Sequence, residues 1–299
     1  MASTKEIKWR IKTVTNTEKI TRAMELISTV KMKKAQDSVL SSRPFAIGAL
    51  KILSTIEDSV SDSLFFAKPK KPNNKELLIV ISSNKWLCGW YNVNIFKKVA
   101  EYLRNNKDKN FDFISIWKKS QDFILRTGAN LIWDFSEVLT DNIELSESKK
   151  VSKDLVNKFS SLAYDKVVVF YSYYVSAITQ RSVAKQFLTI NKQDIISYLE
   201  EIVWISAQEQ IKSIDYAIEP DKNTITNEII PMILDMMFYE ILLEAKASEH
   251  ASRMVAMKNA KDSAGKKVFE LTLKYNKARQ ANITKEISEL VSGVESMKE

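Results

Sequence analysis

The segment SNKWLCGWYN, Ser83 to Asn92, lies where a nucleotide-binding protein would carry its phosphate loop. An apolar run precedes it and a helical pattern follows it, which is the strand–loop–helix order of such loops. A phosphate loop needs several glycines, because its backbone N–H groups must approach the phosphates closely. This segment has one glycine, Gly89, and two tryptophans, Trp86 and Trp90. These residue types favour an aromatic loop over a cofactor cradle.

Residues that could carry catalysis or bind a metal are scarce in the sequence. Cys88 is the only cysteine and His250 the only histidine among 299 residues. A lone histidine offers neither a metal cluster nor a triad, so we expect His250 on the surface or between helices. The sequence also lacks a G-x-G-x-x-G fingerprint, a Walker loop and a nucleophile elbow. We therefore expect no catalytic residue, no bound metal and no cofactor.

The composition favours long helices and a basic surface. Five glycines and five prolines are too few for the many turns of an all-β fold. The net charge of +8 would suit nucleic acid, anionic lipid or acidic protein partners. The most apolar stretch, 229–245, is interrupted by charged residues, so we expect no direct membrane insertion. The N-terminus has no signal-peptide core, and we expect a cytoplasmic protein.

Both ends of the chain have the pattern of long amphipathic helices. We predict one helix over residues 3–58 and another over 227–297, because apolar or small residues recur mainly three or four positions apart. These positions are Ile7, Ile11, Val14, Ile20, Met24 and Ile27, and then Ala264, Val268, Leu271, Tyr275, Ala278, Ile283, Ile287, Leu290 and Val294. A helix of about 65 residues is roughly 100 Å long. The two helices must pack on each other and then on another protein. The basic residues on this rod would suit nucleic acid, but its apolar stripe needs burial by protein, so a nucleic-acid partner is not expected.

The middle of the chain alternates strand and helix patterns. We predict strands at 76–82, 111–117, 129–135, 166–179 and 182–190, and helices at 92–106, 120–127 and 147–161. The last two strands would pair across a turn at Gln180 and Arg181. Such alternation is typical of a mostly parallel sheet with helices on its faces.

The predicted fold is an α/β domain inserted between two long terminal helices that form an antiparallel coiled coil. We assign residues 1–58 to the N-terminal helix, 59–75 to a linker, 76–225 to the inserted domain and 226–299 to the C-terminal helix. The linker ends in AKPKKPNNK, which is rich in proline, asparagine and lysine.

Three stretches near the ends resemble one known family. They are NTEKITRAMELISTVKMKKAQ (16–36), ASEHASRMVAMKNAKDSAG (247–265) and LTLKYNKARQANITKEISELVSG (271–293). Each is similar to part of the γ subunit of rotary, F-type ATP synthases, and the middle of the chain matches that family more loosely. The resemblance implies a terminal coiled coil with an inserted Rossmann-like domain, in agreement with the pattern above.

The resemblance implies a non-catalytic rotor shaft. Such a shaft stands inside a hexamer of α- and β-type subunits, and ATP is hydrolysed chiefly on β. The implied partners also include an ε-like subunit and, at the foot of the shaft, a membrane ring or a replacement docking protein. The chain would then be peripheral to the inner face of the cell membrane.

The resemblance also assigns candidate contacts with the β subunit. Family positions that hydrogen-bond a catch loop of β match Arg279 and Gln280, and those facing an acidic lever loop match Met24, Lys31 and Lys33. On the C-terminal helix, Arg253 and Lys258 lie opposite that lever region by analogy.

The aromatic loop departs from the family. It stands where the family carries SDRGLCGGLN, and Trp86, Trp90 and Tyr91 replace two glycines and a leucine. We expect these three residues to contribute to an interface at the foot of the shaft. Similarly, WKKS (117–120) stands where the family tends to carry a glycine-containing turn.

These departures leave two functions open. One is the ordinary γ subunit, which couples ATP turnover to ion transport. The other is a diverged paralogue whose rotation drives an output without proton pumping, such as a motility or surface apparatus.

Overall fold

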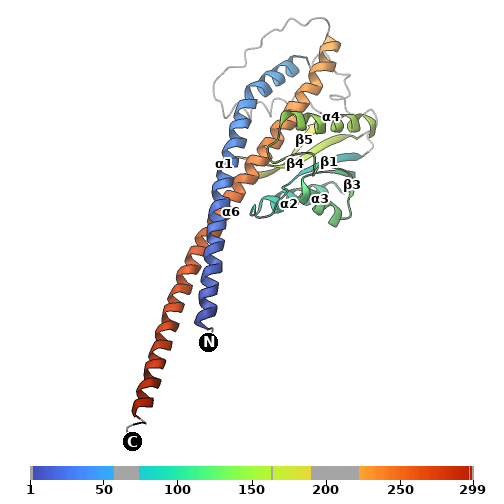
Figure 1. Ribbon diagram of the computed structural model, residues 1–299. Coiled ribbons are helices and arrows are strands. Elements are labelled where there is room, and N and C mark those ends of the chain that lie inside the picture. The colour runs from blue at the N-terminus through green and yellow to red at the C-terminus, as the bar shows by residue number, and fades with distance from the viewer. Residues whose placement is uncertain (1–2, 57–73, 163, 190–221, 296, 298–299) are drawn as a thin grey trace. The chain divides into compact units, whose positions relative to one another are not determined.

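The computed structural model describes residues 3–56, 74–162, 164–189, 222–295 and 297. The first and last elements are long helices, α1 (Thr4–Ile56) and α6 (Lys222–Glu295), as predicted (Figure 1). Most of the predicted linker, 59–73, and the end of the inserted domain, 190–221, lie outside the described residues. The chain forms two compact units, one of residues 1–29 with 253–299 and one of residues 30–252.

In the first unit, α1 and α6 run antiparallel and bury matching heptad positions. The seam positions are Ile7, Ile11, Val14, Glu18, Thr21, Glu25 and Ser28 on α1, and Met257, Lys261, Ala264, Val268, Leu271, Tyr275 and Ala278 on α6, all buried or half-buried. Glu25 pairs with Lys261 at 2.8 Å, and the Glu18 carboxylate lies beside Gly265. Alternating steps of four and three residues are the signature of a coiled coil, so this part of the predicted fold is confirmed.

The α1 side of this seam is less apolar than the sequence indicated. Ile20 and Ile27 were expected in the apolar stripe, but they are 59% and 56% exposed. Their places in the seam are taken by Thr21 at 8% and Ser28 at 2% exposure, whose hydroxyls donate to backbone carbonyls of α1. The strict heptad decides which residues face α6, and here it selects small polar side chains. Ile20 and Ile27 are left on an outer face of α1.

The last turns of α6 extend beyond the start of α1. Counting from the Glu25–Lys261 pair, Thr4 lies opposite Asn282. Figure 1 shows the red end of α6 continuing past the N-terminus. Its apolar positions there are exposed: Ile283 46%, Ile287 55%, Leu290 70%, Val291 54% and Val294 56%. This stripe has no covering helix among the described residues of the chain.

The second unit contains a five-stranded sheet in the order β3-β2-β1-β4-β5. The strands are β1 (Lys75–Ile81), β2 (Asn110–Ile116), β3 (Asn130–Asp134), β4 (Lys166–Tyr174) and β5 (Gln180–Leu188). Neighbouring pairs are parallel except β4 with β5. The predicted turn is wrong by a few residues, because Gln180 and Arg181 are the first residues of β5. The turn is closed instead by Ser176 and Val175, whose N–H groups donate to the Thr179 carbonyl.

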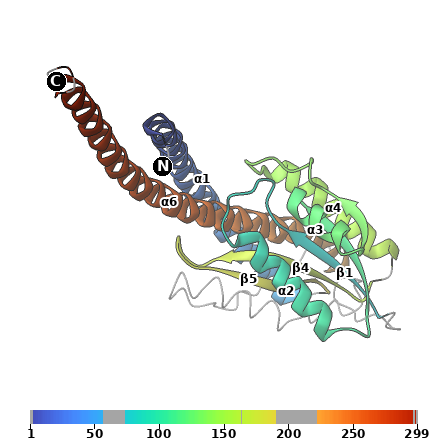
Figure 2. The same ribbon diagram turned by 90° about the horizontal axis from the view of Figure 1, so that it is seen from below.

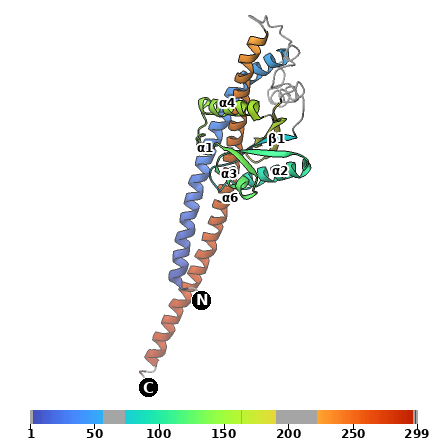
Figure 3. The same ribbon diagram turned by 90° about the vertical axis from the view of Figure 1, so that its right-hand side faces the viewer.

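Helices cover both faces of this sheet, since the inner strands are apolar on both sides. The helices are α2 (Tyr91–Asn105), α3 (Lys118–Arg126) and α4 (Leu145–Leu162). One core contains Leu78, Ile95 and Ile124, and thus joins the sheet to α2 and α3. The other contains Leu77, Val151 and Phe238, and thus joins it to α4 and α6. Figure 3 shows α4 and α2 on opposite sides of the sheet, and Figure 2 shows α2 lying over β4 and β5. The strand order with helices on both faces is Rossmann-like.

Candidate partner-binding surfaces

The loop after β1 is closed by its own side chains. Asn92, in the first turn of α2, donates to the Ser83 hydroxyl at 2.8 Å and to the Cys88 sulfur at 3.3 Å. The Ser83 hydroxyl donates to the Lys85 carbonyl at 2.9 Å. Cys88 is 2% exposed and is therefore buried within the loop. The side chains of Ser83 and Asn92 therefore hold this loop together from within.

Helix α6 occupies the carboxyl edge of the sheet, where a Rossmann-like fold has its ligand crevice. The Tyr91 hydroxyl donates to the Ala245 carbonyl at 3.1 Å. The ammonium of the next residue, Lys246, lies 3.9 Å from the ring centroid of Trp117, which follows β2. Lys246 and Trp117 are 2% and 0% exposed. These contacts bring α6, the start of α2 and the residue after β2 together at this edge.

These contacts correct the grouping of Tyr91 with the two tryptophans. Tyr91 is 3% exposed and supports the loop from within, whereas Trp86 and Trp90 are 62% and 70% exposed. Trp90 has an ordinary φ of −86°. Within the loop, positive φ occurs at Leu87 and Gly89. Positions 86 and 90 therefore do not need glycine, and the indoles project outward without distorting the backbone.

The same contacts fix where the loop lies along α6. The loop is fixed to Ala245, which lies about 35 Å along α6 from Lys222 at 1.5 Å per residue.

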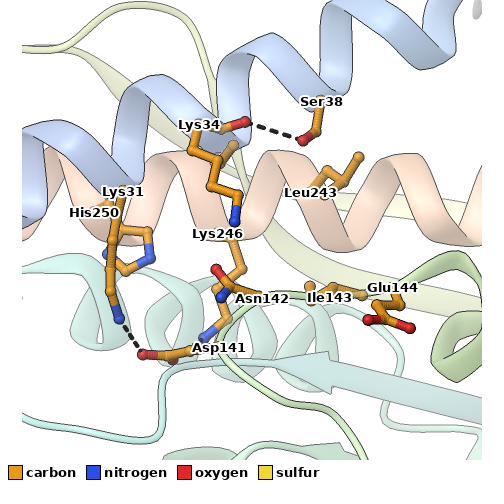
Figure 4. Close-up of a pocket in the computed structure, with 11 residues that line it drawn as sticks. Lys31, Lys34, Ser38, Asp141, Asn142, Ile143, Glu144, Leu243, Lys246 and His250 are labelled. Atoms are coloured by element: carbon orange, nitrogen blue, oxygen red, sulfur yellow. Dashed lines mark hydrogen bonds and ion pairs between the residues drawn. The ribbon is translucent and has the colours of Figure 1, made fainter.

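A carboxylate between β3 and α4 holds lysines from both long helices (Figure 4). Asp141 accepts from Lys31 of α1 at 2.7 Å and from Lys246 of α6 at 3.1 Å, each lysine using a different oxygen. Lys246 is also 3.0 Å from Glu249. Burial alone would raise the pKa of the Asp141 carboxyl. The charge of Lys246 and the hydrogen bond from Lys31 outweigh burial and hold this pKa well below its ordinary value.

A cavity of about 260 Å³ adjoins this ion-pair cluster. Its lining includes Lys31, Lys34, Asp141, Glu144, Lys246 and His250. His250 is 4% exposed on α6 and lies between helices, as expected. The basic and acidic side chains of the lining largely balance, and Asp141 already holds two of the lysines. The cluster is suited to fixing α1 and α6 to the α/β domain.

The candidate β contacts differ in how they are placed. Lys33, Lys258, Arg279 and Gln280 are exposed, and Met24 is half-buried. Arg253 is only 8% exposed. Lys31 already pairs with Asp141 within the chain, so contact with another subunit cannot be its only interaction.

Asp141, Lys246 and Trp117 were not singled out from the sequence as candidate residues. The only sequence feature that pointed to any of them was WKKS, which replaces a glycine-containing turn and includes Trp117. Trp117 has φ of +67°, a conformation that glycine adopts easily and other residues adopt at about 1–3 kcal/mol. Its indole N–H donates to the Leu139 carbonyl at 3.3 Å. Burial and the Lys246 contact hold it in this conformation.

Comparisons with known proteins agree with this structure. A family model described as ATP synthase matches residues 3–297. The ATP synthase gamma chain of Roseiflexus sp. (strain RS-1) is 34% identical over 305 residues, covering 100% of both chains. That of Christiangramia forsetii is 35% identical over 299 residues, covering 99% of both.

Two solved structures share the fold. The central stalk and c-ring structure of Tetrahymena thermophila mitochondrial ATP synthase contains a chain with a TM-score of 0.61 at 24% identity, covering 81% of this chain and 99% of that one. In the OSCP/F1/c-ring structure of Euglena gracilis mitochondrial ATP synthase, the TM-score is 0.60 at 17% identity, covering 97% and 94%.

The fold is an α/β domain carried by two long terminal helices that pair as a coiled coil. The relatives make the assignment specific, since two of them exceed 30% identity over nearly the whole chain. The chain belongs to the ATP synthase gamma chain family.

Proposed function

We propose that this chain is the central rotor shaft of an F-type ATPase and couples ATP turnover on a surrounding hexamer to rotation. The observation that carries the proposal is full-length identity of 34% to a protein named ATP synthase gamma chain. The paired terminal helices provide the shaft, and the Asp141 cluster joins residues of both helices to the α/β domain.

The exposed apolar residues at the end of α6 favour the proposal that partner subunits surround this part of the helix. Ile283, Ile287 and Leu290 recur at steps of four and three on one helical face. Their exposure would make the isolated chain prone to association. A sleeve of α- and β-type subunits would bury this stripe and gain about 25 cal/mol for each Å² covered.

The proposed mechanism is a population shift. An asymmetric shaft binds each conformation of the β-type subunit with a different free energy, so shaft angle and nucleotide occupancy bias each other. In this proposal ATP is bound and hydrolysed on the partner, chiefly β. The contributing residues on the shaft are the exposed Lys33, Lys258, Arg279 and Gln280.

The setting of the complex is part of the proposal. No helix in the described ranges of the chain is long and apolar enough to span a membrane. We place the chain in the cytoplasm, peripheral to the inner face of the membrane, with a membrane ring and an ε-like subunit at its foot. The name ATP synthase gamma chain of the relatives favours this function over a motility or surface output.

Reconstitution tests the proposal. Mixed with its α- and β-type partners, the chain should enter a complex with one copy for three of each, as measured by native mass spectrometry. The double variant I287S/L290S should fold but enter that complex poorly, whereas the charge variant E286Q on the same helix should assemble normally. A soluble monomer with no affinity for the hexamer would contradict the proposal.

A further inference from the structure

The carboxyl edge of the sheet carries exposed apolar side chains in the loops after β1 and β4 and at the start of α2. It consists of Trp86, Leu87, Trp90, Val93, Val175 and Ile178, here named the carboxyl-edge patch. Their exposed fractions are 62%, 58%, 70%, 39%, 47% and 82%. The loops that carry them follow β1 and β4, which are adjacent and parallel, so the loops lie at the same edge.

Basic residues surround this patch. No acidic residue occurs between Glu76 and Glu101, while Lys85, Lys97 and Lys98 lie in that interval. The whole β4–β5 hairpin, 166–188, is also free of acidic residues and includes Arg181. Two cations nearby already have acidic partners, because Lys98 pairs with Glu101 and Lys119 pairs with Asp122. The rim is therefore predominantly basic, which is complementary to a partner with acidic side chains around an apolar stripe.

Part of the patch runs as a stripe along α2, which an apolar stripe on a partner helix can match. Trp90, Val93 and Lys97 are spaced at i, i+3 and i+7, so they share one face of α2. The ammonium of Lys97 lies 5.7 Å from the ring centroid of Trp90, and that of Lys119 lies 4.0 Å from that of Trp86. These cations restrict the rings, so less side-chain entropy is lost when a partner binds. Tryptophan with neighbouring basic residues is the usual composition of an interface hot spot.

We propose that the carboxyl-edge patch binds an amphipathic helix of a partner protein, with its apolar stripe on Trp86 and Trp90 and its acidic side chains against the surrounding lysines. The inference rests on the proposed function only for the complex in which it is tested. It adds a contact on the α/β domain to those assigned on the two shaft helices.

Site-specific photo-crosslinking in the purified complex tests this proposal. Benzoylphenylalanine replaces Trp86 or Trp90, and in the control it replaces Trp133, which is 40% exposed and lies within β3. Native mass spectrometry first confirms that each complex is assembled, which reports on the proposed function alone. Crosslinks from positions 86 and 90 should then converge on one helical peptide with acidic residues beside apolar ones, and position 133 should not reach it.

Other outcomes would overturn the proposal while the shaft function stood. These are crosslinks to phospholipid, crosslinks to a second copy of the chain, and an assembled complex with no crosslink above the control. Phosphatidylglycerol vesicles test the lipid alternative directly. The tryptophans should not be responsible for any sedimentation of the full chain with these vesicles.

Affinity measurements separate recognition from mere proximity. The crosslinked peptide should bind the wild-type complex, and W86S or W90S should each weaken binding by about 30-fold, the value for an interface hot spot. K97E should also weaken binding of the peptide, and the loss should be larger at low salt than at high salt. An unchanged affinity for W86S and W90S, with unchanged thermal unfolding, would show that the tryptophans are not the binding residues.

Discussion

Lys246 of α6 places its ammonium 3.1 Å from the carboxylate of Asp141, although these residues are 105 positions apart. The lysine is 2% exposed and the carboxylate 39%. A buried charge is tolerated only when it is paired. Because Asp141 also holds Lys31 of α1, one carboxylate joins both long helices to the α/β domain.

Replacing Asp141 by Asn should destabilise the domain that contains it. Two lysines lose a charged partner, but Glu249 still pairs with Lys246 and Asp141 is partly solvated. We therefore expect a loss of about 1–2 kcal/mol, less than the 3–5 kcal/mol of a fully buried broken pair. Urea unfolding of the full chain measures it. Asp154→Asn is the matched control, because Asp154 is exposed and forms no ion pair among the described residues; equal losses in both variants would show that the cluster contributes nothing.

The difference between wild type and D141N should depend on pH. The pKa of Asp141 is lower in the folded chain than its ordinary value, so the unfolded state binds more protons in acid. The carboxylate stabilises the folded state above the unfolded pKa of about 3.9, and this stabilisation declines as pH falls below that value. Unfolding free energies at a series of pH values should show the two proteins converging in acid. A difference that grew in acid would contradict this account of the cluster.

Glu25 and Lys261 should be coupled across the coiled coil. E25K or K261E alone places like charges in the seam and should lower the stability of the paired helices. The double variant E25K/K261E should recover part of that loss. Thermal unfolding by circular dichroism provides the double-mutant cycle. The same exchange at Lys285 and Glu289, which are 76% and 65% exposed on one helix, should give much weaker coupling.

Arg279 and Gln280 should affect turnover and not folding. Both are exposed, so R279A/Q280A should change the stability of the chain by less than about 0.5 kcal/mol. In the assembled complex, each lost hydrogen bond to a charged partner is worth about 1.5–3 kcal/mol, which corresponds to at least a tenfold slower ATP turnover. Lys277→Ala, on the same exposed part of α6, should leave the rate near wild type. Unchanged turnover in the double variant would show that the pair is only a solvated face.

The order of helices and strands could be predicted from the sequence because periodicity and turn residues are local signals. The predicted helix 92–106 is α2, Tyr91–Asn105, and the predicted strand 111–117 is β2, Asn110–Ile116. The faces of the long helices were harder to predict. Apolarity suggested Ile20 and Ile27 as seam residues, but the position of α6 selects Thr21 and Ser28. That choice depends on a partner that lies more than two hundred residues away in sequence.

The candidate site was only partly predictable for a similar reason. Trp86 and Trp90 attract notice because they lie in a polar loop, and both are exposed. Tyr91 has the same aromatic character in sequence, yet its contact with Ala245 buries it. Asp141 and Lys246 are ordinary charged residues until the fold brings them together.

The most direct test of the central claim is to watch the chain turn inside its hexamer. The partner hexamer is fixed to a surface, and a gold rod is attached to the variant Lys107→Cys on the exposed turn after α2; the native Cys88 is buried and should not react. With ATP, the account predicts stepwise rotation in one direction, at a rate that follows ATP turnover. Sustained ATP hydrolysis by the labelled complex without directed rotation of the rod would contradict it.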